Sequence, residues 1–237
     1  MEALRKLRFF HTLSLELDDL KGMLTYKFYF VNNPQSHALS VFTAGMVKLN
    51  DIMKLHFYGG AKTVTGANYL LESGGHKILV DCGLNQGSHF AERQNFEPFP
   101  YDPKGIEAVL VTHSHIDHIG RIPKLFNNGF RGTVYSTPAT KDFSEFLLLD
   151  SEHILAKEAE RERKALLYSV ADVSDVMKIW KKIEYHTPFE VGPFRVTFYN
   201  AGHILGSAII LVEAEGKRIV FSGDLGNYPA PIIQATE

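Results

Sequence analysis

The feature that most constrains the fold is an apolar run, IEAVLVT at residues 106–112, which ends directly in the polar cluster HSHIDH. A near-continuous apolar run of this length is typical of a strand that is buried on both faces. Such a strand needs a covering layer on each side, and helical patterns alternate with strand patterns along the rest of the chain. The sequence therefore predicts a layered α/β protein in which the polar cluster lies at the carboxyl end of a buried strand.

Short strand signals separated by turn residues make up most of the chain after Met53. Glycines at position 66 and at positions 74 and 75 separate the first three signals, and this spacing predicts a β-meander. The remaining strand signals follow the polar cluster, with turns at VGP and EAEGK. The predicted strands are MKLHFYGG (53–60), NYLLES (68–73), HKILVDCG (76–83), GTVYST (132–137), FEVGPFRVTFYNAG (189–202), SAIILVEAEG (207–216) and KRIVFSGDLG (217–226).

Three stretches carry helical signals. Apolar residues from Ile119 to Phe126 recur at helical spacing, with Gly129 where a C-terminal cap is expected. A long helix is predicted after Pro138 and Thr140, over residues 142–168, because this stretch is rich in Leu, Ala, Glu, Lys and Arg. A further helix is predicted from Val173 to Lys182.

Residues 1–52 show mixed periodicity and no motif, with a turn signal at residues 32–34. The pattern changes abruptly at Met53, where the organised part of the chain begins. We therefore expect residues 1–52 to be a variable N-terminal extension of unknown role. A start-site artefact that is not native to the protein is the alternative.

The bulk composition limits the class of protein. A chain of 237 residues with 45% hydrophobic residues is long enough to bury a core, so a globular protein is expected. The net charge of -2 gives no overall positive field, so any nucleic-acid binding must come from local patches. The single cysteine, Cys82, excludes an internal disulfide and fits a reducing cytoplasm, where we expect the protein to be located. No apolar run approaches the roughly 20 residues that span a bilayer, so no membrane partner is expected.

The polar cluster places three imidazoles and one carboxylate within six residues, His113 to His118. Imidazole nitrogens and carboxylate oxygens are ligands that zinc accepts, and residues two apart at a strand end can point at one ion. His113 and His115 would face one ion, whereas Asp117 and His118 would face a neighbouring position. This division predicts two adjacent metal sites. The alternative is a solvated polar loop, or a helix cap formed by Asp117.

Three further residues occupy the same kind of position, a short loop at the end of an apolar strand. They are Asp81 in LVDCG, His203 in NAGHILGS and Asp224 in FSGDLG. Taken alone, His203 could be a loop or core histidine, and either aspartate could be a turn residue. Combined with the cluster, His203 joins His113 and His115 on the first ion, and Asp224 bridges the two ions. Asp81 is expected to accept a hydrogen bond from a ligand histidine and to fix its tautomer.

These residues resemble a known family. THSHIDHIG is similar to the HxHxDH signature of the metallo-β-lactamase superfamily, with Asp81, His203 and Asp224 in the positions of its first, third and fourth motifs. AGHILGSA, SGDLG and the segment PATKDFSEFLLLDSEHILAKEAE further resemble the β-CASP branch, which processes RNA. The resemblance covers Met53 to about Asn227, and it assigns residues 53–237 to the first part of a metallo-β-lactamase domain.

The resemblance implies an αββα sandwich and a zinc-dependent ribonuclease, endonuclease or exonuclease, that hydrolyses phosphodiester bonds with a metal-bound hydroxide. Asp117 would orient the attacking water, and the expected partner is single-stranded RNA. In the branch, an inserted domain and later motifs follow the fourth motif and supply another zinc ligand and a catalytic histidine. No histidine follows His203 here. We therefore expect the C-terminal strands and the β-CASP domain to be missing, the second Zn²⁺ site to be incomplete, and the uncovered sheet to favour association, for example as a homodimer.

Two other functions remain open on the residues alone. The same two-zinc site could hydrolyse a small ester, thioester or lactam, as glyoxalase-like relatives do, because a fold does not fix a substrate. The chain could also be a non-catalytic partner or an inactive remnant. No constellation of residues in the sequence distinguishes RNA from DNA.

Overall fold

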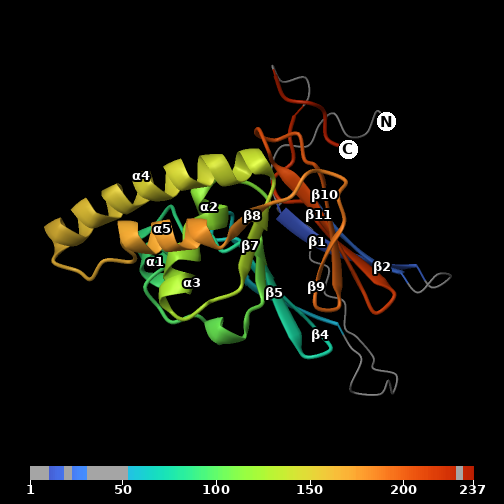
Figure 1. Ribbon diagram of the computed structural model, residues 1–237, viewed down its shortest axis with the longest axis horizontal. Coiled ribbons are helices and arrows are strands. Elements are labelled where there is room, and N and C mark those ends of the chain that lie inside the picture. Colours follow the sequence, from blue (N-terminus) through green and yellow to red (C-terminus); the bar gives the residue numbers. More distant parts are fainter. Residues whose placement is uncertain (1–10, 19–22, 31–52, 228–231) are drawn as a thin grey trace.

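The computed structural model describes residues 11–18, 23–30, 53–227 and 232–237. Two β-sheets lie face to face, and helices cover the outer side of the larger sheet (Figure 1). The six strands of that sheet are ordered β3-β4-β5-β6-β7-β8. Their bounds are β3 Lys54–Gly59, β4 Asn68–Ser73, β5 His76–Val80, β6 Ala108–Leu110, β7 Thr133–Ser136 and β8 Trp180–Lys182.

The first three strands of the large sheet are antiparallel, as the meander predicted, and β5 to β8 are parallel. Parallel neighbours need crossover connections, and helices supply them. These are α1 His89–Gln94, the 3₁₀ helix η2 Pro103–Gly105, α2 Ile116–Ile119, α3 Ile122–Asn127, α4 Pro138–Glu162 and α5 Val170–Lys178.

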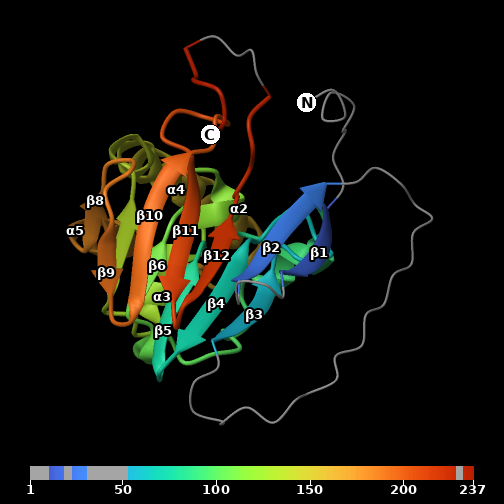
Figure 2. The same ribbon diagram turned by 90° about the vertical axis from the view of Figure 1, so that its right-hand side faces the viewer.

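The smaller sheet is antiparallel throughout, in the order β12-β11-β10-β9 (Figure 2). Alternate residues of its longer strands, such as Phe194, Val196 and Phe198 on β10, lie in the core between the sheets, which is typical of antiparallel sheets. The bounds are β9 Phe189–Val191, β10 Phe194–Asn200, β11 Ala208–Ala214 and β12 Lys217–Phe221.

Two apolar cores follow from this layering. One lies between the large sheet and its helices and includes Val109, Leu125 and Trp180. The other lies between the two sheets and includes Leu110 and Phe198. Because Val109 and Leu110 are neighbours on β6 and face different cores, that strand is buried on both faces, as its apolar run predicted.

The layers are helices, sheet and sheet, which are three of the four layers of the predicted αββα sandwich. Within the described ranges no helix lies on the outer face of the small sheet. Nor does any helix there have the length and apolar character to cross a membrane.

The helix boundaries differ from the predicted ones. The helix expected from Ile119 to Phe126 is split into α2 and α3, because Pro123 has no N–H to donate and the Arg121 N–H bonds to the Cys82 carbonyl. The helix expected to reach residue 168 ends at Glu162, where Arg163 adopts a left-handed conformation.

The helix predicted from Val173 to Lys182 is also wrong at both ends. Ser169 and Asp172 form a capping box, so α5 begins earlier, at Val170. It ends at Lys178, and the residues that follow form β8, which pairs in parallel with β7. Tertiary pairing at the sheet edge therefore decides the conformation of this segment.

The N-terminal residues contain structure that the sequence reading missed. His11–Asp18 (β1) and Met23–Phe30 (β2) form an antiparallel pair beside β12 (Figure 2). The turn signal at residues 32–34 lies outside the described residues.

Candidate metal centre

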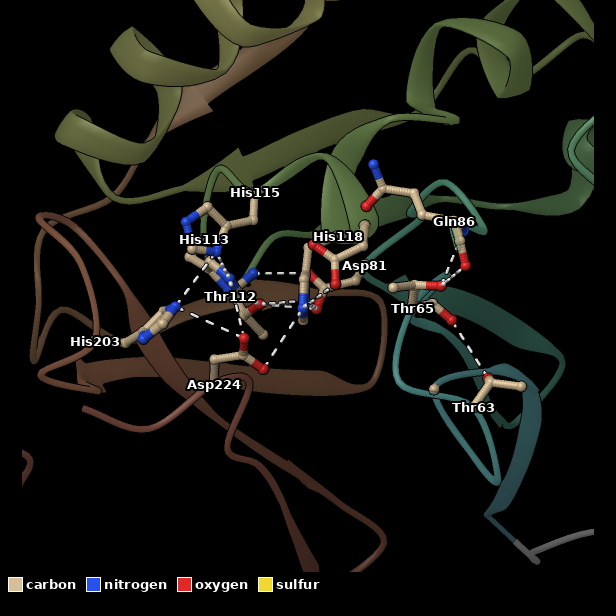
Figure 3. Close-up of polar contacts among 12 residues, drawn as sticks. Thr63, Thr65, Asp81, Gln86, Thr112, His113, His115, His118, His203 and Asp224 are labelled. Carbon is tan, nitrogen blue, oxygen red and sulfur yellow. Dashed lines mark hydrogen bonds and ion pairs between the residues drawn. The ribbon is translucent and has the colours of Figure 1, made fainter. Parts of the chain in front are cut away.

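Four strands of the two sheets end at one edge, and each delivers a predicted site residue there (Figure 3). β5 leads to Asp81 and β6 leads to the cluster that begins at His113. From the small sheet, the loop between β10 and β11 carries His203, and β12 leads to Asp224. Segments far apart in the sequence therefore lie close together, because these strands of the two sheets end at one common edge.

Backbone contacts hold the cluster against the loop after β5 and against Ala67, which directly precedes β4. The amide of Cys82 donates to the carbonyl of His118 at 2.8 Å, and the amide of Ala67 donates to that of Asp117 at 2.9 Å. At Gly83 the two segments are so close that a Cβ atom would lie 1.6 Å from the Asp117 carbonyl oxygen. Only glycine allows this approach, so Gly83 is required for the position of the cluster.

The first group of donor atoms consists of three imidazoles and one carboxylate. His113 Nε2 lies 3.0 Å from His115 Nδ1, which lies 3.3 Å from His203 Nε2. Asp224 Oδ2 lies 3.8 Å from His113 Nε2 and 3.7 Å from His203 Nε2. All four residues can offer a ligand atom within 4.8 Å of the others.

The second group uses the other oxygen of the same carboxylate. His118 Nε2 lies 3.7 Å from Asp224 Oδ1 and 3.8 Å from Asp117 Oδ2. A small pocket lies at this group and is lined by His118 and Asp224, and also by Val64 and Tyr69. Asp224 therefore presents one oxygen to each group, which is the arrangement of a bridging ligand.

These distances fit metal coordination. Tetrahedral zinc with bonds of about 2.0 to 2.1 Å separates neighbouring ligand atoms by about 3.3 Å. The first group, with separations from 3.0 to 3.8 Å, lies around that value. Nitrogen and oxygen donors of this kind suit zinc and related divalent ions. The donor set of the first group therefore fits a divalent metal.

Thr112 and Asp81 lie behind the donor atoms. Asp81 is 1% exposed and accepts hydrogen bonds of 2.8 Å from the Thr112 amide and the Thr112 hydroxyl. Its Oδ2 also lies 2.8 Å from His118 Nδ1. Because the Thr112 hydroxyl donates its proton to Asp81, Thr112 Oγ1 can accept a hydrogen bond from the N–H of His113 Nδ1 at 3.0 Å. The Nδ1 protons of His113 and His118 are then directed at Thr112 and Asp81. Nε2 of each ring is left without a proton and free to bind metal.

Thr112 is the residue of this centre that the sequence reading missed. Its only signal is that it stands directly before His113 at the end of β6, and threonine is common at strand ends. Asp81, by contrast, lies where the pattern placed it, and its backbone is held in a left-handed conformation with φ of 58°.

The surroundings of His113, His203 and His118 shift their pKa values in different directions. Burial, together with the charges of His118, His115 and His203, lowers the pKa of His113 far below its ordinary value. Burial also lowers the pKa of His203, although Asp224 opposes it. Burial would lower the pKa of His118 as well, but the charge and hydrogen bond of Asp81, together with the charges of Asp117 and Asp224, outweigh it, and the pKa rises to about 9.

The plainer readings of these residues do not account for the geometry. A solvated loop would leave the imidazoles exposed, whereas His113 is 0% and His118 is 5% exposed. Asp117 does not cap a helix, because α2 begins after His115 and no side chain bonds to its first amides.

Comparisons with known proteins identify the family of the chain. The family described as Metallo-beta-lactamase superfamily matches residues 62–233. The chain is 39% identical over 181 residues to a ribonuclease of Thermus thermophilus, which covers 76% of this chain and 40% of that protein. It is 39% identical over 174 residues to the transcription termination factor FttA of Methanosarcina mazei, covering 70% of this chain and 26% of that protein. It is 28% identical over 193 residues to the cleavage and polyadenylation specificity factor 73 of Drosophila melanogaster, covering 79% of this chain and 27% of that protein. The chain thus spans two fifths or less of these relatives.

Proposed function

The chain belongs to the metallo-β-lactamase superfamily of hydrolases, and on this premise we propose that it is a zinc-dependent ribonuclease of the β-CASP type. The observation that carries the proposal is the position of Asp224, whose two oxygens face two separate groups of donors. Two-metal sites of this kind are common in enzymes that cleave phosphodiesters. The choice of RNA is supported by the names of the relatives, among them a ribonuclease with 39% identity.

Zinc ions bound at both groups would act as Lewis acids, lower the pKa of a water molecule and neutralise charge on the scissile phosphate. The residues of the chain supply the rest of the chemistry. His113, His115, His203 and Asp224 would hold the first ion, and Asp117, His118 and Asp224 the second. The second group offers fewer protein atoms, so weaker binding is expected there.

Asp117 and Asp81 would have different roles. The side chain of Asp117 is 20% exposed and lies beside His118 Nε2, so its carboxylate can accept a proton from an attacking water and orient that water. Asp81 has no access to solvent, and it acts through His118 by holding the Nδ1 proton. Asp117 is therefore the candidate catalytic residue, and Asp81 is a positioning residue.

The test is a comparison of substrates for the zinc-loaded chain. Labelled single-stranded RNA, DNA of the same sequence, and a panel of thioesters and lactams would be incubated with the chain and with Asp117→Asn. Because the second zinc site is expected to be incomplete, we expect only slow cleavage of RNA, in preference to DNA, and loss of that cleavage in Asp117→Asn. Turnover of a thioester or lactam without any RNA cleavage would refute the assignment of RNA as the substrate. Absence of zinc binding would refute the whole proposal.

A further inference from the structure

The metal-ligand loop of the small sheet is held by a helix of the opposite layer. This loop, residues 201–207, joins β10 to β11 and carries His203. Figure 1 shows that α4, on the far side of the large sheet, begins close to this end of β10 and β11. The contact between them brings together residues that are more than 60 positions apart in the sequence.

Two buried threonines at the start of α4 make this contact. The hydroxyl of Thr137 donates to the Gly206 carbonyl oxygen at 2.6 Å, and the hydroxyl of Thr140 donates to the same oxygen at 2.8 Å. Thr137 is 1% and Thr140 is 0% exposed, so water cannot replace either donor without a rearrangement. A carbonyl oxygen has two lone pairs, and here both are used by hydroxyl groups from another element.

At Gly206 the loop backbone lies too close to α4 for a side chain to fit. Gly206 has φ of 87°, and a Cβ atom there would lie 2.7 Å from the Thr140 amide nitrogen and 2.9 Å from Thr137 Oγ1. The loop backbone therefore lies directly on the first turn of α4. Thr137 also accepts the Thr140 amide as the N-terminal cap of the helix, so the cap and the loop contact share one side chain.

Within the loop, the contact is transmitted to His203. Ser207, the neighbour of Gly206, has an Oγ that accepts from the amide of His203 at 3.0 Å and from the amide of Ile204 at 3.2 Å. Fixing Gly206 therefore fixes Ser207, and Ser207 fixes the backbone that bears the imidazole. His203 Nε2 in turn stands 3.3 Å from His115 Nδ1.

We propose that Thr137 and Thr140 are positioning residues for the metal centre, which hold His203 in place through Gly206 and Ser207. This inference rests on the metal site of the proposed function. Residues that orient a metal ligand from behind typically change affinity by about tenfold to a hundredfold when they are removed. The first ion, which His203 would bind, should be affected and the second much less.

Thr140→Val tests the proposal, because it keeps the branched shape and replaces the hydroxyl with a methyl group that cannot donate a hydrogen bond. Thr140→Ser restores the hydroxyl. Ser144→Ala is the matched control, since Ser144 is 0% exposed on the same helix and its hydroxyl bonds to the Thr140 carbonyl at 2.6 Å within α4. It removes a buried hydroxyl from α4 without touching the loop.

Zinc affinity would be measured by competition with a chelator, and the visible spectrum of the cobalt-loaded chain would report the ligands of the first ion. We expect Thr140→Val to lower the affinity for the first ion by about tenfold to a hundredfold and to change the cobalt spectrum. Thr140→Ser and Ser144→Ala should stay within about threefold of the wild type, well below that range. If the zinc affinity of Thr140→Val equals that of Ser144→Ala, the positioning role is wrong. It is also wrong if Thr140→Ser binds the first zinc as weakly as Thr140→Val does. If the unmodified chain binds no zinc, the metal site itself is wrong.

Discussion

Replacing Asp81 with asparagine in the metal-free chain should lower the free energy of unfolding by about 2 to 3 kcal/mol at pH 6.5. The carboxylate is buried, and three donors lie 2.8 Å from its oxygens. Its charge and hydrogen bond are the largest of the effects that raise the pKa of His118 from 6.5 to about 9, against the opposing effect of burial. A shift of that size corresponds to about 3 kcal/mol, with Asp117 and Asp224 supplying the smaller share.

The effect should depend on pH in one direction. The folded pKa of His118 lies above the unfolded one, so its contribution to stability is complete below about pH 6.5 and is lost as the pH rises through about 9. The difference between the wild type and Asp81→Asn should therefore shrink over this interval. Comparing the two proteins at each pH cancels the titration of groups that both contain.

The assay is urea unfolding in the presence of a chelator, followed by the fluorescence of Trp180. This is the single tryptophan of the chain, and it is 3% exposed. Asp102→Asn is the control, because Asp102 caps the exposed 3₁₀ helix and asparagine also caps well, so the change should be below about 0.5 kcal/mol. A cost for Asp81→Asn that is no larger than the control, or one that stays constant from pH 6.5 to above pH 9, would refute the reasoning.

Three further predictions concern the ions. His115→Ala should abolish tight binding of the first zinc, because His115 Nδ1 lies between two other donors, and near-normal zinc content would show that it is not a ligand. Asp224→Asn should lower the affinity for both ions together. Loss of only one ion in a stepwise titration would show that Asp224 does not bridge the two. Affinity for the second ion should rise about tenfold per pH unit from pH 7 towards about 9, because binding must displace the proton of His118, and a flat profile over this range would contradict it.

The sequence predicted the parts of the fold that depend on local pattern. The apolar run before His113 identified a strand buried on both faces, and strand-end positions placed Asp81 and Asp224 at one edge. Glycines at tight turns separated β3, β4 and β5 correctly. These signals are local, so a single sequence carries them.

The errors arose where local signals are weak or ambiguous. β8 has only three residues, and its pairing with β7 outweighs the helical pattern of the preceding segment. The sequence does not predict the β1–β2 pair, although Leu13, Leu15 and Leu17 alternate with polar residues, because this short alternation lies within a stretch of mixed periodicity.

The supporting residues of the site could not be predicted for a different reason. Thr112 contacts Asp81 across 31 positions, and Thr140 contacts Gly206 across 66. Neither threonine belongs to a sequence pattern that indicates its partner, because the packing of the layers brings each pair together.

Anomalous diffraction at the zinc edge, from crystals of the chain grown with zinc, tests the central claim most directly. Two peaks are predicted, about 3.5 to 4 Å apart. One should lie among His113, His115 and His203 and the other beside Asp117 and His118, with one oxygen of Asp224 on each. A single ion bound away from Asp224, or no ion at these residues, would contradict the account.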